Sequence, residues 1–145
     1  MQFDISRDFL DGILLQQPPA REGAPEIRAA GQLHFLPSSP DGTMHTAIVS
    51  FALFLGKEEK AGEQPFARGG WRFLFTTDKP FNPAKEPENQ FFGSLLMLGT
   101  GKIMATINNL SMLANLPLIP FEPQRMALQK APAAPAAPAQ QAAQQ

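Results

Sequence analysis

The chain of 145 residues contains no cysteine and no tyrosine, and its one tryptophan stands beside twelve phenylalanines. The lack of cysteine excludes a disulfide framework, cysteine-ligated zinc, an iron–sulfur cluster and a cysteine nucleophile. An excess of one charge is also missing, because 12 Lys and Arg face 13 Asp and Glu and leave a formal net charge of -1. Such a balance predicts neither a nucleic-acid partner nor a polybasic membrane patch.

Long hydrophobic runs are absent as well. No basic region leads into an apolar stretch after Met1, so a signal peptide is not expected. The longest apolar run, 47–55, is interrupted by Ser50 and is too short to cross about 30 Å of hydrocarbon. The sequence therefore predicts no membrane insertion and a cytoplasmic location.

Apolar and polar residues alternate in four segments, which predicts β-strands at residues 3–15, 27–36, 46–55 and 66–76. In the first segment, Phe3, Ile5 and Phe9 share one expected face, and Asp11-Gly12 indicates a turn or bulge. The second and third segments flank a Pro/Asp/Gly-rich stretch, which predicts an antiparallel hairpin. In the fourth segment, the glycine pair 69–70 indicates a bulge or a close backbone approach.

Beyond Phe91 the apolar residues recur at three- and four-residue steps, which predicts a helix that ends before Pro117. Because Gly99 and Gly101 weaken helices, its regular part is expected to begin near Thr100. Strands followed by helices indicate an α+β fold, a four-stranded antiparallel sheet with a long helix and a short C-terminal helix packed on one side. The short helix is expected at 123–130, where proline opens it.

The chain is expected to form one domain, residues 1–128. Residues 129–145 are almost entirely Ala, Pro and Gln. Such a segment cannot bury enough apolar surface to offset the entropy lost on ordering, so a disordered tail is predicted.

Residues that could carry chemistry are few. His34 and His45 flank the expected hairpin turn and could face each other across strands, with Asp41 as the only nearby carboxylate. Surface or packing roles suit these histidines better than a metal site. The string 99–102, Gly-Thr-Gly-Lys, lacks the earlier glycine and the following hydroxyl residue of a phosphate loop. No nucleophile motif is present, so the sequence predicts no enzyme and no cofactor.

Apolar residues exceed what one core needs. They also occupy the second face of the expected sheet, at Ile48, Ala52, Phe54 and Leu74, and lie off the helical stripe, at Met97, Met104 and Met112. A small domain with this surplus must cover it by oligomerising or by binding a partner. Flexible Met and rigid Phe on an exposed face also suit a promiscuous hydrophobic binder.

Three strings, in this order, resemble one family. The first is Phe-Asp-Ile-Ser-Arg-Asp-Phe at 3–9, the second is Phe-Ala-Arg-Gly-Gly-Trp-Arg-Phe at 66–73, and the third is the helix 95–110 followed by Leu-Pro-Leu-Ile-Pro-Phe-Glu at 116–122. Together they are similar to the first strand, the glycine-pair strand, and the long helix with its proline loop in SecB, the protein-export chaperone. The likeness spans residues 3–128.

This resemblance implies a homo-oligomer, a dimer of dimers, that acts as an ATP-independent holdase. Its partners would be unfolded precursor proteins on their way to export. The resemblance also implies an apolar groove that binds clients. A set of apolar residues is expected near this groove, and packing in the core is the alternative role for each. These residues are Phe9, Ile27, Trp71, Phe73, Leu118, Phe121 and Met126.

The family also binds the translocase motor SecA through acidic residues on its sheet. Two of those positions hold Gly12 and Gln16 here, which weighs against SecA as a partner. Asp11 stands one residue early, and a shift by one residue is expected to turn it to the opposite face. The alternative is a SecB-like adaptor for one dedicated partner, such as a toxin–antitoxin component or a secreted effector, without hand-off to the motor.

Overall fold

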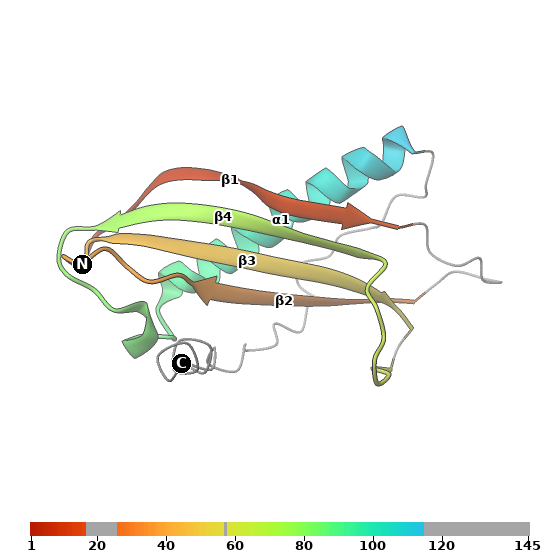
Figure 1. The fold of residues 1–145 in the computed structure, drawn as a ribbon, viewed down its shortest axis with the longest axis horizontal. Coiled ribbons are helices and arrows are strands. Elements are labelled where there is room, and N and C mark those ends of the chain that lie inside the picture. The colour runs from red at the N-terminus through yellow and green to blue at the C-terminus, as the bar shows by residue number, and fades with distance from the viewer. Residues whose placement is uncertain (17–25, 57, 115–145) are drawn as a thin grey trace, which may run out of the picture.

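The computed structural model describes residues 1–16, 26–56 and 58–114. Four antiparallel strands lie in the order β1-β4-β3-β2, and a long helix crosses one face of the sheet (Figure 1). The elements are β1 (Phe3–Leu15), β2 (Ile27–Phe35), β3 (Met44–Leu55), β4 (Ala67–Thr77), the 3-10 turn η1 (Pro83–Lys85) and α1 (Gln90–Leu113). The α+β fold and its antiparallel sheet are confirmed. The expected helix at 123–130 and the tail at 129–145 lie outside the described residues.

The hairpin of β2 and β3 follows the predicted alternation. Its register pairs Ile27 with Leu55 and Phe35 with Ala47, so every second residue of β3 points to the same side. The side that faces α1 is buried at Ala47, Val49, Phe51 and Leu53. Strand β4 adds Phe73 and Phe75 to the same layer. The core therefore lies between the sheet and α1, and the other side of the sheet, here called the open face, has no described helix over it.

Strand β1 departs from simple alternation. Its pairing with β4 shifts between Ile5 and Arg7 and again between Leu10 and Gly12. The first shift places Asp8 opposite the buried Phe73, and it moves Phe9 to the open face. The expectation that Phe9 shares a face with Phe3 and Ile5 is therefore wrong, because a bulge reverses the alternation that follows it. The second shift is the irregularity that the Asp-Gly pair predicted.

Helix α1 begins ten residues before the expected regular part, at Gln90. The Asn89 side chain accepts a hydrogen bond from the Phe91 backbone N–H at 2.9 Å and caps the helix. Phe91 and Phe92 then pack against Phe3 and Phe75 in an aromatic cluster. Tertiary packing of this first turn outweighs the cost of the helical glycines. The helix ends before Pro117, as predicted.

Two glycines let α1 approach the sheet closely. A Cβ atom built on Gly99 would lie 2.6 Å from Val49 Cγ2, and one built on Gly69 would lie 2.7 Å from Ile103 Cγ2. Real Cβ atoms do not come this close, so both contacts need glycine. At the glycine pair the close contact is with a side chain, that of Ile103, and not with another backbone as predicted. Met104 is buried beside these contacts, so it belongs to the core and not to the surplus surface.

The variant Gly99→Ala is expected to lower the free energy of unfolding by about 1–3 kcal/mol, because the new methyl group forces α1 away from Val49. Gly101→Ala is the matched control, since its Cβ would meet nothing within 4 Å. That change is expected to raise stability by roughly 0.5–1 kcal/mol through helix propensity. Urea denaturation of both variants measures the difference. Equal effects in the two variants would contradict the close approach.

Candidate functional site

The outward side of α1 is almost free of charge. Lys102 is the only charged residue among the 24 of the helix. Met97 is 54% exposed, Met112 is 62% exposed and Leu98 is 45% exposed. A helix that faces water normally carries charged residues on its outer face. We call these three side chains the helix outer face.

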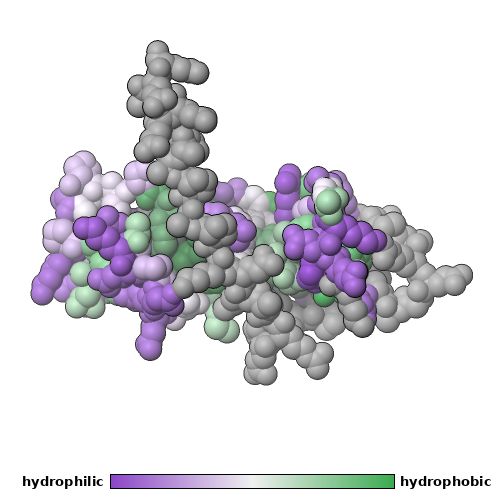
Figure 2. Space-filling model, turned by 90° about the horizontal axis from the view of Figure 1, so that it is seen from below, coloured by the Kyte–Doolittle hydropathy of each residue, from purple (hydrophilic) through white to green (hydrophobic). Residues whose placement is uncertain are grey.

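A groove opens where the end of β1 meets the C-terminal end of α1. Every residue that lines it is apolar: Ile13, Leu14, Leu15, Leu110, Leu113 and Ala114. Leu113 is 84% exposed, so the apolar lining reaches the surface. Figure 2 views the opposite, β2, edge of the molecule, where hydrophobic surface also shows between hydrophilic groups. This β1–α1 groove can accept apolar side chains, and no ionisable side chain lines it.

The structure does not gather the expected client-binding residues in one place. Phe73 is 0% exposed and lies in the core between sheet and helix. Phe9 lies half-buried on the open face of β1, and Ile27 is exposed at the start of β2 on the opposite edge of the sheet. Trp71 is half-buried beneath α1. Leu118, Phe121 and Met126 lie outside the described residues.

Trp71 takes part in a polar contact that joins sheet and helix. Its indole Nε1–H donates to Asp8 Oδ1 at 2.8 Å, and Lys102 Nζ donates to the same oxygen at 2.5 Å. The Lys102 ammonium also lies 5.2 Å from the centre of the Trp71 ring. These bonds, that from Lys102 first, hold the pKa of the Asp8 carboxyl below its usual value. The carboxylate thus stays ionised and serves to fix α1 on β1.

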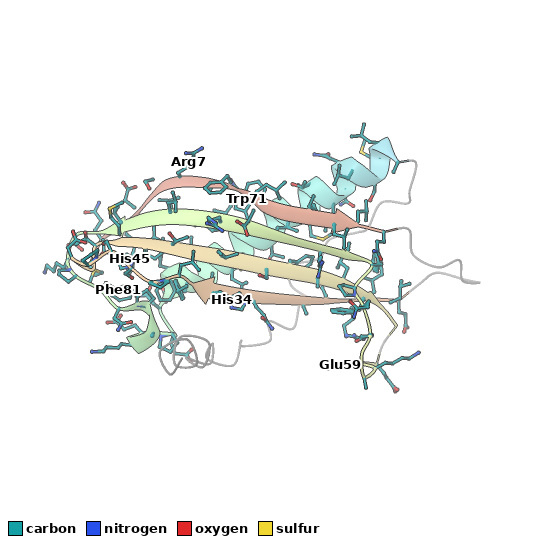
Figure 3. The ribbon with its side chains drawn as sticks, viewed as in Figure 1. Arg7, His34, His45, Glu59, Trp71 and Phe81 are labelled. Carbon is teal, nitrogen blue, oxygen red and sulfur yellow. The ribbon has the colours of Figure 1, made fainter. Side chains whose placement is uncertain are left out.

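The two histidines lie on opposite faces of the sheet, so the expectation that they could face each other is wrong. His34 pairs with Ile48 on the open face, whereas His45 pairs with the buried Phe75. Figure 3 places His45 beside Phe81 at one end of the sheet, away from His34. His45 Nδ1 contacts Ser38 Oγ at 2.7 Å and Nε2 contacts Thr77 Oγ1 at 3.1 Å. Both ring nitrogens are therefore engaged in structural contacts.

Asp41 was the carboxylate considered together with the two histidines as a metal ligand. In the structure it stabilises the turn between β2 and β3. Its carboxylate accepts hydrogen bonds from Ser39 and Thr43, and these bonds lower its pKa. Among residues 1–16, 26–56 and 58–114, no group of three His, Asp or Glu side chains could hold a metal ion.

The open face carries features that sequence reasoning missed. The second shift in β1 keeps Asp11 on this face, where its carboxylate pairs with Arg72 at 2.7 Å. The expectation that Asp11 turns to the opposite face is therefore wrong, because the bulge absorbs the displaced residue. Arginine alternation in β4, at positions 68 and 72 around Gly70, was the signal that could have revealed this basic surface.

Comparison with known proteins adds no relative. The chain matches no model of a known protein family, and a search of curated proteins finds no match. The likeness to SecB thus depends on the three strings and their order. Within the part of the chain that the structure describes, no helix combines the length and the hydrophobicity of a membrane span.

Stability is expected to depend on pH through His45. The side chain is 4% exposed, and its burial lowers the pKa of the ring below the usual value. The His45 ring of the unfolded chain then binds a proton at a pH at which the folded chain does not. The free energy of unfolding therefore falls as the pH drops below about 6.5. From about pH 7.5 to about pH 5.5, the loss is expected to approach at most about 1.4 kcal/mol per pH unit.

Urea denaturation at fixed protein concentration measures this dependence. The variant His45→Gln keeps a polar side chain without a proton to bind, so its stability should change less over the same pH range. An equal loss in the variant would show that another group titrates.

Proposed function

We propose that this protein is a SecB-like holdase, an ATP-independent chaperone that binds unfolded preproteins in the cytoplasm for export. The observation that carries the proposal is the apolar β1–α1 groove, which continues to the exposed Leu113 at the end of α1. A groove lined by apolar side chains and without charged ones suits many apolar segments and no particular sequence.

The energetics of such binding require no nucleotide. Each Leu- or Phe-sized side chain that enters an apolar groove contributes about 2 kcal/mol before ordering costs. A single contact of this size is weak. Several contacts along one unfolded chain reinforce each other, because the first contact raises the effective concentration of the next. A holdase built in this way needs repeated apolar surface, which oligomerisation supplies.

We propose in addition that the chain has a short C-terminal helix and that it assembles as a dimer of dimers. The uncharged helix outer face supports assembly, since Met97, Leu98 and Met112 would otherwise remain in water. Gly93 adds to this support, because its missing side chain leaves open space on the outer side of α1 into which a partner helix can pack.

A second candidate is the partner-specific adaptor without hand-off to SecA. It is favoured by the open face, where Gly12 stands in place of a docking acid and Arg68 and Arg72 lie on the neighbouring strand. A basic sheet would repel a basic docking segment and select another partner.

Purified protein is expected to suppress the aggregation of several chemically unfolded proteins at micromolar concentration without nucleotide. The variant Leu113→Asp should weaken this activity several-fold, because it places a charge in the β1–α1 groove. Light scattering of the client measures both. Met44→Asp is the matched control, since Met44 is 62% exposed but lies away from the groove.

The outcomes separate the two candidates. Suppression of many clients, lost in Leu113→Asp alone, supports the holdase. Failure with every client contradicts it, and capture of one dominant protein from a lysate of the source cell would then favour the adaptor.

Multi-angle light scattering is expected to show a mass above that of the 15.8 kDa chain, with a tetramer as the proposed state. Met97→Glu should lower the mass, because a charge on the helix outer face opposes burial between subunits. Met44→Glu serves as the control and should leave the mass unchanged. A monomeric wild-type protein would contradict the oligomer, whatever the variants do.

A further inference from the structure

The β1–α1 groove lies where the described part of the chain ends. Ala114, the C-cap of α1 and its last described residue, is itself one of the residues that line the groove. The groove has a volume of about 520 Å³, which is within the usual range of ligand-binding pockets. Residues 115–145 follow Ala114 in the chain. The residues that come directly after α1 therefore begin at the rim of the groove.

The first of these residues are as apolar as the groove. Residues 116–121, here called the exit segment, read Leu-Pro-Leu-Ile-Pro-Phe and contain no charged or polar side chain. Each proline restricts itself and the residue before it to extended backbone, so this sequence is not expected to continue α1. Each proline also lacks a backbone N–H, which lowers the cost of burying the segment against apolar side chains.

The β1 side of the groove offers backbone groups that β4 does not use. The Gln16 N–H donates to the Phe66 carbonyl at 2.7 Å, so Gln16 and, by alternation, Leu14 turn their backbone groups toward β4. Those of Ile13 and Leu15 point the other way, to the edge of the sheet, where the described residues provide no further strand. An extended segment can therefore form hydrogen bonds with two residues that are two positions apart.

The exit segment matches this spacing. In an extended chain, Leu116 and Leu118 have their backbone groups on one side and Pro117 has its nitrogen on the other. The two leucines can therefore bond to Ile13 and Leu15, while the proline faces away from the sheet, as prolines of edge strands do. Directly opposite residues of a sheet point their side chains to the same face. Since Ile13 and Leu15 pack toward the core, the two leucines would also fill the groove.

We propose that the exit segment occupies the β1–α1 groove of its own chain, and that a client must displace it. The inference rests on the proposed client site in this groove, and it makes Leu118 a competitor of the client instead of a contact to it. Because the segment is tethered, its effective concentration is in the millimolar range. With an intrinsic Kd of about 0.1 mM, it would fill the groove in roughly nine chains of ten. Only clients with several apolar segments would then bind well.

The segment of the same chain is favoured over that of a second copy. Leu113, at the edge of the groove, is 84% exposed among the described residues, and only two residues separate it from Leu116. A contact between neighbours in the chain closes a short loop, and the entropy cost of closing a loop rises with its length. A segment from another copy would lose translational and rotational freedom in addition.

The test uses the full chain and a fluorescein-labelled peptide with the sequence of residues 115–122, followed by fluorescence anisotropy. The double variant Leu116→Ser/Leu118→Ser weakens the tethered competitor, so it is expected to bind the peptide about tenfold more tightly than the wild type does. Adding Leu113→Asp to the double variant should abolish binding, because a charge then lines the groove. Met44→Ser removes an exposed apolar side chain away from the groove and should bind as the wild type does.

Equal affinity of the wild type and the double variant for the peptide, or no binding to either, would overturn the proposal. Multi-angle light scattering should give both proteins the same mass. A lower mass of the double variant would show that the exit segment binds a second copy, which also overturns it.

The client assay gives an independent readout. If the wild type suppresses client aggregation, the double variant should do so at a lower protein concentration. Weaker suppression by the double variant would show that the exit segment is part of the client site, and the competitor role would be wrong. The peptide measurement involves no client, so it decides the inference even where the holdase function fails.

Discussion

The close contact of α1 with the sheet is the constraint on which the rest of the structure depends. Gly99 lies against Val49 and Gly69 against Ile103, and neither position has room for a Cβ atom. This approach buries the helix-facing side chains of the two central strands and brings Lys102 within reach of Asp8. Because the helix turns its apolar stripe to the sheet at short range, its opposite side projects outward with almost no charge.

Two surfaces of different chemistry result from this arrangement. The helix outer face and the β1–α1 groove are apolar and offer contacts without hydrogen-bonding specificity, which suits unfolded chains and subunit assembly. The open face carries arginines together with Asp4 and Asp11, and Asp11 pairs with Arg72 there. The two surfaces meet at the end of β1, where Ile13 and Leu14 border both.

Much of the fold could be predicted because period-two and helical patterns are local. The alternation in β3, the hairpin around Asp41 and the end of α1 before Pro117 all follow from neighbouring residues. The faces of Phe9 and Asp11 could not be predicted, because two bulges in β1 reverse the alternation and only the pairing with β4 locates them. The start of α1 was misjudged for a related reason: an asparagine cap and aromatic packing outweigh two helical glycines.

The sequence by itself determined the class of fold, the lack of metal-binding and catalytic motifs, and the surplus of apolar residues, since composition and periodicity carry this information. Tertiary structure alone decided where each apolar residue lies. It placed Phe73 in the core, Phe9 under two arginines and Leu113 at the edge of a groove. The physical reason is that a side chain's exposure depends on strand register and on the approach of a distant helix, and both are set by contacts between residues far apart in the chain.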